Sequence, residues 1–158
     1  MVKQSAGILA YRRQSHEIEV FLIHPGGPFW ANKDEGAWSI PKGEFDDSEE
    51  PLAAAKREFQ EEIGQPIAGK FLALTPVRQP SRKVVHAFAV EAQIDPANLK
   101  SNSFELEWPP RSGKRAMFPE VDRAAWFSIS EASKKMLPGQ LPILIEVQKL
   151  LKDELNRT

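Results

Sequence analysis

Hydrophobic residues gather in two neighbouring stretches near the start of the chain, residues 5–13 with Ile8, Leu9 and Tyr11, and residues 18–24, where they alternate with polar residues at the start. Alternation with a period of two, in residues rich in valine, isoleucine and aromatics, predicts β-strands with one face buried. Only residues 14–17 separate the two stretches, so we expect them to pair as a hairpin. The sequence Pro-Gly-Gly-Pro at residues 25–28 then ends the second strand.

Further strands are predicted later in the chain. Residues 71–79 and 83–93 are β-rich and are separated by a turn at residues 80–82, and Trp126 with Phe127 indicates a short buried strand. Residues 95–119 between them are expected to form a long connection without regular structure. Loops of this length are usually either functional or disordered.

One central helix is predicted between two recognisable ends. It is expected to begin near Ser48 or Glu49, with Ser48 as N-cap and Pro51 in the first turn, and to end at Gly64. Its predicted inward stripe consists of Leu52, Ala55, Lys56, Phe59 and Ile63. Two further helices are predicted at residues 130–137 and 141–155, and the second carries its own apolar stripe. That stripe consists of Ile143, Leu144, Val147, Leu150 and Leu151. Periodicity alone therefore predicts a mixed α and β fold.

Composition limits the classes of protein that this chain can represent. Its 158 residues, 41% of them apolar, fit one domain spanning residues 1–158. A net charge of −1 provides no global attraction to nucleic acid or to an anionic membrane. The absence of cysteine excludes disulfides and thiolate catalysis. Neither a signal peptide nor a membrane-spanning run is visible, so we expect a cytoplasmic protein, either a monomer or a homodimer.

Three glutamates of the central helix are expected to lie together on one arc beside its apolar stripe. These residues, Glu58, Glu61 and Glu62, are called the glutamate cluster below. Neighbouring carboxylates at spacings of three and four residues repel one another. A cation with oxygen ligands would turn that repulsion into binding, and Mg²⁺ suits such ligands. The alternative interpretation is a solvated acidic surface, which is the usual role of paired glutamates.

The spacing around the cluster favours the metal site. Seven residues from Gly43 to Gly64 stand at fixed spacings, in the pattern G-x5-E-x7-R-E-U-x-E-E-x-G, where U is a bulky apolar residue. Seven such identities would coincide by chance on the order of once in a hundred million registers. The segment from Gly43 to Gly64 therefore resembles the Nudix box. One position departs, because Gln65 stands where the pattern has a bulky apolar residue, and Ile67 is the next apolar candidate.

The resemblance implies a fold and a set of roles. The expected fold is the Nudix α/β (α+β) sandwich, in which a mixed sheet lies between helices. By resemblance, the carbonyl of Gly43 and the glutamate cluster hold Mg²⁺, or Mn²⁺ in its place. Arg57 is expected to orient a glutamate through a salt bridge. For Glu49 two roles stay open, a water-mediated contact with the metal or an ion pair with Arg57.

A second feature of the family concerns Glu120, which stands six residues before Trp126. By resemblance it supplies a further metal ligand or the general base, against the alternative of a surface glutamate. The family does not decide between Glu58 and Glu120 as base. Glu105 and Glu107 are the reserve candidates for the role of Glu120.

Candidate substrate contacts lie outside the box. Lys42 is adjacent to the turn glycine and is interpreted as a phosphate ligand or as an ordinary surface lysine. The aromatic segment of residues 29–38, which ends at Trp38, either stacks on a base or packs on the core. Arg111, Lys114 and Arg115 make the long connection basic, which suits a polyphosphate or a solvated loop. His86 in its predicted strand is interpreted as a packed or edge residue rather than a catalyst.

The reaction that the resemblance implies is Mg²⁺-dependent hydrolysis of a diphosphate linkage in a small nucleotide. The motif Trp-x-x-Pro-Lys-Gly at residues 38–43, together with Glu120, is similar to the diadenosine tetraphosphate hydrolases of this family, which release ATP and AMP. The long connection at residues 95–119 departs from them. Nucleoside triphosphates, sugar nucleotides and, less favoured, an RNA 5′-triphosphate end therefore stay open. A nucleotide-binding regulatory module without turnover is the alternative from another class.

Overall fold

The computed structural model describes residues 3–155, and a mixed sheet forms its centre. Five strands form the main path of the sheet in the order β4-β6-β1-β2-β9, while β3 pairs with β1 and β5 with β6. In chain order the elements are β1 (Gln4–Gln14), β2 (Glu17–Pro25), β3 (Lys42–Phe45), α1 (Pro51–Ile63), β4 (Leu72–Ala73), β5 (Val77–Arg78), β6 (Val84–Glu91), η1 (Pro96–Asn98), β7 (Ser103–Glu107), β8 (Arg115–Pro119), β9 (Val121–Ser128), α2 (Ile129–Lys135), η2 (Pro138–Gln140) and α3 (Leu141–Leu155). β1 runs parallel to β6 and antiparallel to β2, which makes the sheet mixed, as expected.

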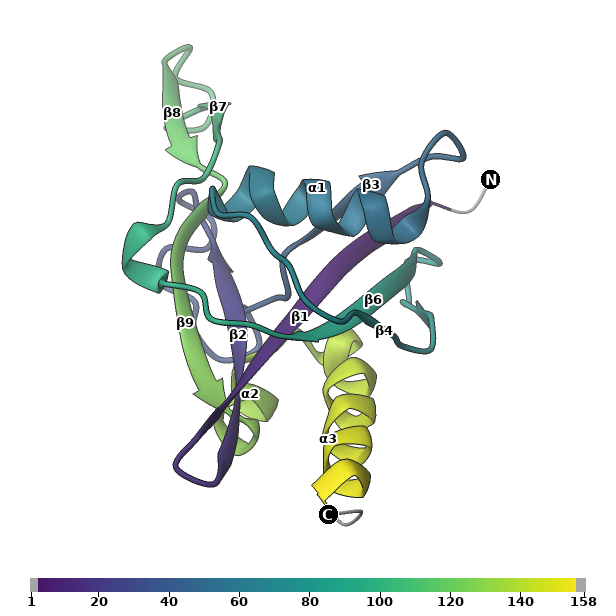
Figure 1. Ribbon diagram of the computed structural model, residues 1–158. Coiled ribbons are helices and arrows are strands. Elements are labelled where there is room, and N and C mark those ends of the chain that lie inside the picture. The colour runs from purple at the N-terminus through teal and green to yellow at the C-terminus, as the bar shows by residue number, and fades with distance from the viewer. Residues whose placement is uncertain (1–2, 156–158) are drawn as a thin grey trace.

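Helices cover the two faces of this sheet (Figure 1). On one face α1 buries Ala54, Ala55, Phe59 and Ile63 against alternate residues of β1 and β2, such as Ile8 and Phe21. On the other face α3 buries Ile143, Leu144, Val147 and Leu151 against the complementary set, which includes Leu9 and Leu22. Successive residues of β1 thus point into different cores, as the pleat of a strand requires. The α/β sandwich expected from the sequence is confirmed.

Several predicted elements differ from the structure. Residues 71–79 form two short strands, β4 and β5, instead of one, and both pair with β6. Residues 95–119 are not an irregular loop, because they contain η1 and the antiparallel hairpin β7–β8. The hairpin projects from the body of the molecule (Figure 1). Its two strands read Ser-Phe-Glu-Leu-Glu and Arg-Ala-Met-Phe-Pro, so the alternation that predicts strands was present in both.

Smaller differences concern the helices. Ser48 does not cap α1: Glu50 occupies the N-cap without a side-chain bond, and Pro51 is in the first turn as expected. Gly64 ends α1 in the left-handed conformation, with φ of 78°, which confirms its predicted role. Lys56 is exposed rather than part of the buried stripe, and Ala54 lies there instead. In α3, Leu150 is 40% exposed.

A segment far from the C-terminus in sequence is fixed by the C-terminal elements. The backbone of Trp38 accepts a hydrogen bond from the amide of Leu137 and donates one to the carbonyl of Lys135. Gln140 is completely buried, accepts a bond from the amide of Ile40 at 3.0 Å and donates to Ser39 Oγ at 2.9 Å. These contacts set the path of residues 38–40, which lead directly into β3. No helix in residues 3–155 is long and apolar enough to cross a membrane.

Candidate active site

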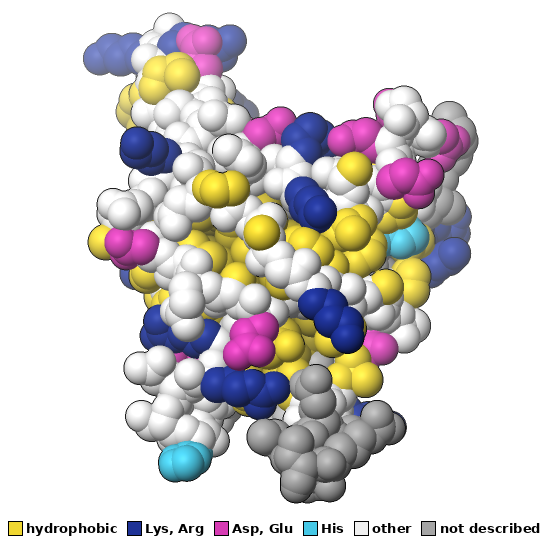
Figure 2. Space-filling model, in the orientation of Figure 1, with side chains coloured by type: hydrophobic (Ala, Val, Ile, Leu, Met, Phe, Trp, Pro, Cys, Tyr) yellow, Lys and Arg dark blue, Asp and Glu magenta, His cyan; other side chains and the backbone are white. Residues whose placement is uncertain are grey.

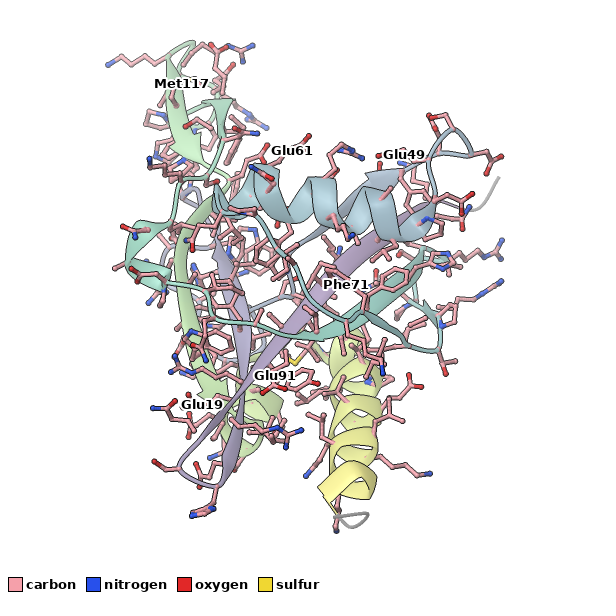
Figure 3. All side chains as sticks on the ribbon, viewed as in Figure 1. Glu19, Glu49, Glu61, Phe71, Glu91 and Met117 are labelled. Carbon is pink, nitrogen blue, oxygen red and sulfur yellow. The ribbon has the colours of Figure 1, made fainter. Side chains whose placement is uncertain are left out.

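The turn before α1 brings the helix beside β3. Asp46 accepts hydrogen bonds from the backbone amide and the hydroxyl of Ser48, and its carbonyl accepts one from the amide of Glu49. These bonds form a compact turn, so Ser48 stabilises the turn rather than the helix end. α1 then runs across the sheet, with Glu49 near its start and Glu61 near the end beside the projecting hairpin (Figure 3).

Gly43 lies in direct contact with the carboxylate of Glu58. A Cβ atom built on Gly43 would lie 2.0 Å from Glu58 Cδ and 2.1 Å from Glu58 Oε2. Gly43 itself is paired with Ala6 of β1, so its backbone has little freedom to move away. The need for glycine therefore comes from this close approach of backbone and carboxylate.

Arg57 connects the box glutamates. Its guanidinium forms two parallel bonds to Glu49, from Nε to Oε2 and from Nη2 to Oε1, both at 2.8 Å. Its Nη1 donates to Glu58 Oε1 at 2.9 Å and to both carboxylate oxygens of Glu61 at 3.3 Å. Of the two roles left open for Glu49, the structure shows the ion pair with Arg57. The predicted salt bridge from Arg57 to a glutamate is present as well.

Glu62 is the most buried member of the glutamate cluster. Its Oε2 is buried and has no hydrogen-bond partner within the described residues. Burial, reinforced by the neighbouring charge of Glu58, raises the pKa of Glu62 to about 8. The pKa of Glu58 is also raised, mainly by burial, although Arg57 opposes the change. The charge of Glu120 contributes to both shifts, so Glu120 belongs to the same electrostatic environment.

Lys42 is next to these carboxylates. Its ammonium is half-buried, and burial followed by repulsion from Lys83 lowers its pKa, while Glu62, Glu44 and Glu58 oppose the change. Lys42 is therefore not the ordinary surface lysine of the alternative interpretation.

The donors of this site fit a hard divalent cation, although they are not gathered around one point. Among the side chains that the structure describes, no three acidic or histidine residues converge tightly enough to form a ready cation site. Arg57 accounts for this arrangement, because it holds Glu58 and Glu61 as ion-pair partners. The fit rests on an unpartnered buried carboxylate oxygen on Glu62 and on the contact of Glu58 with Gly43. Carboxylate and carbonyl oxygens are the ligands that Mg²⁺ and Mn²⁺ take.

Other predicted residues are distributed around the site. Trp38 is only 4% exposed and packs edge-on against Phe127 and His24, so its ring belongs to the core and cannot stack on a base. The indole and the backbone are held by three different elements, a tertiary arrangement that the local sequence does not reveal. The basic residues Arg111, Lys114 and Arg115 lie at the exposed tip of the β7–β8 hairpin.

The remaining candidates have structural partners. Glu105, a reserve candidate, pairs with Arg115 at 3.2 Å on the hairpin, and Glu107 lies on the same exposed face. His86 donates to or accepts from Gln4 and packs edge-on against Phe45, which confirms the interpretation of a packed histidine. Gln65 binds the backbone carbonyls of Asp95 and Asn98 through its amide. A polar anchor thus replaces the apolar residue of the box pattern, while Ile67 packs against the α1 core.

Sequence reasoning missed two features near the site. The role of Gln140 cannot be predicted from the sequence, because a buried glutamine has no recognisable local signal. The contact between Phe29 and Trp108, whose ring centroids lie 5.4 Å apart, also escaped notice. The two residues are far apart in sequence, and only the hairpin brings them together.

The fold is shared with many solved structures. The NUDIX domain of Shewanella oneidensis NrtR, solved with ADP ribose, superposes with a TM-score of 0.66 at 12% identity, covering 96% of this chain and 89% of that one. A C. elegans Ap4A hydrolase in a binary complex gives 0.65 at 18% identity, covering 96% and 99%. The M. smegmatis Nudix hydrolase RenU gives 0.62 at 19%, covering 95% and 86%. Identities this low establish a common fold only.

The family itself is established by the sequence as a whole. No curated protein matches this chain. The model of the NUDIX domain, however, matches residues 1–147, which is most of the chain. The box from Gly43 to Gly64 lies within that match, on a strand–turn–helix of the expected form. The chain belongs to the NUDIX domain family, whose enzymes are pyrophosphohydrolases.

Proposed function

We propose that this protein hydrolyses a diphosphate linkage in a nucleotide with the help of a divalent cation, Mg²⁺ or Mn²⁺. The glutamate cluster and the carbonyl of Gly43 would hold the cation. When bound, it neutralises the phosphate oxygens, lowers the pKa of water and aligns the attacking oxygen with phosphorus. The observation that carries the proposal is the buried, unpartnered oxygen of Glu62 beside Glu58 and Gly43.

The side chains of the protein supply the remaining functions. Glu58 or Glu120 takes the proton of the attacking water. The raised pKa of Glu58 lies nearer to neutral pH than that of an ordinary carboxylate, and a general base is most effective when its pKa is close to the operating pH. Lys42 contacts the phosphate chain. Arg57 holds Glu58 through an ion pair and thereby positions a residue that contacts the reacting atoms.

The experiment exchanges single carboxylates for amides. Glu61→Gln and Glu62→Gln are each expected to abolish metal-dependent hydrolysis, because an amide keeps the shape of the side chain and loses its charge. Glu50→Gln is the matched control, since Glu50 is exposed at the N-cap and makes no side-chain capping bond. Full turnover in either cluster variant, with phosphate products identified by chromatography, would refute the assignment.

The substrate requires a separate assignment. We propose a nucleoside diphosphate linked to a second moiety, and the sequence motifs suggest a dinucleoside polyphosphate such as diadenosine tetraphosphate. A panel of dinucleoside polyphosphates, nucleoside triphosphates, ADP-ribose and triphosphorylated RNA would identify the leaving group. Binding of a nucleotide without any product would instead indicate a regulatory module.

A further inference from the structure

The β7–β8 hairpin, residues 103–119, is attached directly beside the candidate site; it is called the arm below. Glu120 follows its last residue, and the amide of Glu120 donates to the carbonyl of Asn102 at 2.8 Å. The carbonyl of Glu120 in turn accepts from the amide of Gly26 at 2.9 Å. The base of the arm is therefore fixed to the loop after β2 and to Glu120 at once. Figure 1 shows the arm rising beside the end of α1.

One face of the arm is aromatic and packs on the loop after β2. Phe104 and Phe118 are opposite each other in register, with ring centroids 6.0 Å apart. A Cβ on Gly27 would lie 2.9 Å from Phe104 Cζ, so this glycine, with φ of 97°, allows loop and arm to touch. Higher on the arm, Trp108 meets Phe29 of the loop edge to face at 5.4 Å. The contacts make loop and arm one continuous surface.

Phe29 presents an exposed aromatic ring beside the arm. Its side chain is 61% exposed, in the loop of residues 26–41 between β2 and β3. With its contact to Trp108 the ring is orientated and still presents an open face. Base stacking on such a face contributes about 1–3 kcal/mol per base and does not depend on sequence.

The tip of the arm carries exposed cationic side chains. Within the described residues neither Arg111 nor Lys114 forms an ion pair, whereas Arg115 pairs with Glu105. The tip turn is ordered by bonds from the amide of Ser112 to the carbonyl of Pro109 and from the amide of Lys114 to Ser112 Oγ, both at 3.1 Å. In Figure 2 dark-blue side chains gather on this projection. In a chain of net charge −1 the positive charge of the tip is a local feature.

The position of these cations decides what they can bind. Four residue steps separate Pro119 from Arg115, a distance of about 14 Å along an extended strand. A single diphosphate held at Glu120 does not span that distance. The amide of Trp108 donates to the carbonyl of Lys114 at 2.9 Å, so the cations lie level with the aromatic pair or beyond it. In a dinucleoside polyphosphate every phosphate lies between the two nucleosides, whereas in a nucleic acid phosphates continue past each base.

We propose that the arm binds a short single strand of nucleic acid whose 5′ phosphates reach the glutamate cluster. A base near the 5′ end stacks on Phe29, and the following phosphates contact Arg111 and Lys114. The inference rests on the proposed function in placing the reacting diphosphate at α1. It identifies the nucleoside that carries the reacting diphosphate as the first nucleotide of a chain, in preference to one end of a dinucleoside polyphosphate.

Binding of a labelled oligonucleotide tests this proposal without turnover. The probe is a five-nucleotide RNA with a 5′-triphosphate and a 3′ fluorophore, followed by fluorescence anisotropy in the presence of EDTA. Phe29→Ala is expected to weaken binding about tenfold. The double variant Arg111→Gln, Lys114→Gln is expected to weaken binding by a similar factor. It should also reduce the slope of the logarithm of the binding constant against the logarithm of the salt concentration by about 1.4, since each single-strand phosphate contact contributes about 0.7. The double variant Lys134→Gln, Lys149→Gln, which removes two exposed cations elsewhere, controls for net charge and should bind as the wild type does.

The outcomes separate this inference from the proposed function. If oligonucleotide binding depends on the arm and the protein hydrolyses no diphosphate, the inference about the arm is supported and the proposed function is wrong. If the protein hydrolyses a diphosphate and the arm variants bind the oligonucleotide as the wild type does, the inference about the arm is wrong and the proposed function stands. If the arm variants impair turnover of diadenosine tetraphosphate and leave RNA binding unchanged, the arm holds a second nucleoside and the nucleic-acid assignment is wrong.

Discussion

At the scale of single residues, the candidate site is defined by close approaches that allow few side chains. Gly43 touches the carboxylate of Glu58, and Glu62 carries a buried oxygen without a partner. The charge of Glu58 beside Glu62 and the burial of an unsatisfied acceptor on Glu62 each raise the free energy of the folded protein. A bound cation would relieve both. The same carboxylates thus lower the stability of the folded protein and provide the proposed cation site.

Gly43→Ala tests the first of these contacts. The new methyl group cannot coexist with Glu58 in its present position, so Glu58 must move by an ångström or more. We expect kcat/KM to fall about 100-fold, as a displacement of that size commonly causes. Gly139→Ala is the control, because its nearest neighbour would be Gln79 Nε2 at 3.7 Å, an ordinary contact. Wild-type activity in Gly43→Ala would show that the contact is not needed.

The burial of Glu62 predicts a pH dependence of stability. In the folded protein the pKa of Glu62 is about 8, above its ordinary value of 4.5, so between these values the folded state holds a proton that the unfolded chain releases. Rising pH in this window therefore favours unfolding. In EDTA the free energy of unfolding should fall by about 2 kcal/mol more between pH 6 and pH 8 in the wild type than in Glu62→Gln. Denaturant titration at both pH values measures it, and parallel behaviour of the two proteins would contradict the assignment.

At the scale of elements, local patterns predicted α1 well and the arm poorly. The ends of α1 follow from Pro51 and Gly64, which act through local backbone geometry. The arm was expected to be irregular even though its strands alternate, because a proline-rich turn and a long gap between elements masked the signal. The burial of Trp38, which excludes base stacking, could not be predicted for another reason. Its burial depends on contacts with β2, β9 and the α2 end, which no local pattern contains.

Arg57 acts within one element and its preceding turn, and Arg57→Lys tests its geometry. A lysine keeps the charge and loses the parallel bonds to Glu49 together with the bond to Glu58. Because Arg57 lowers the pKa of Glu58, its loss should raise that pKa and move the acid limb of the kcat/KM profile to higher pH. Arg57→Ala should move it further. A pH–rate profile with the same acid limb in all three proteins would exclude a positioning role for Arg57.

At the scale of the whole molecule, the C-terminal elements support the site from the opposite side of the sheet. Gln140 bonds Ile40 and Ser39, and these residues lead into Lys42 and Gly43. The amphipathic pattern of α3 predicted its packing, while the hydrogen bonds of Gln140 could not be read from the sequence. The path of the segment that leads into Lys42 therefore depends on a residue a hundred positions away.

Gln140→Leu tests this long-range support. The substitution leaves the buried amide of Ile40 without an acceptor, at a cost of about 1–3 kcal/mol in the free energy of unfolding. Thermal denaturation should show a clear decrease in Tm. Gln148→Leu makes the same exchange at an exposed position of α3 and should leave the Tm nearly unchanged. Equal effects of the two substitutions would mean that the buried bonds of Gln140 contribute nothing.

The central claim is that the acidic side chains of α1 bind a divalent cation beside Gly43. Electron paramagnetic resonance of free Mn²⁺, titrated into the protein and displaced by Mg²⁺, measures this binding directly. We expect the wild type and Glu50→Gln to bind Mn²⁺ alike, and Glu58→Gln and Glu62→Gln to lose most of that binding. Unchanged Mn²⁺ binding in both Glu58→Gln and Glu62→Gln would contradict the account.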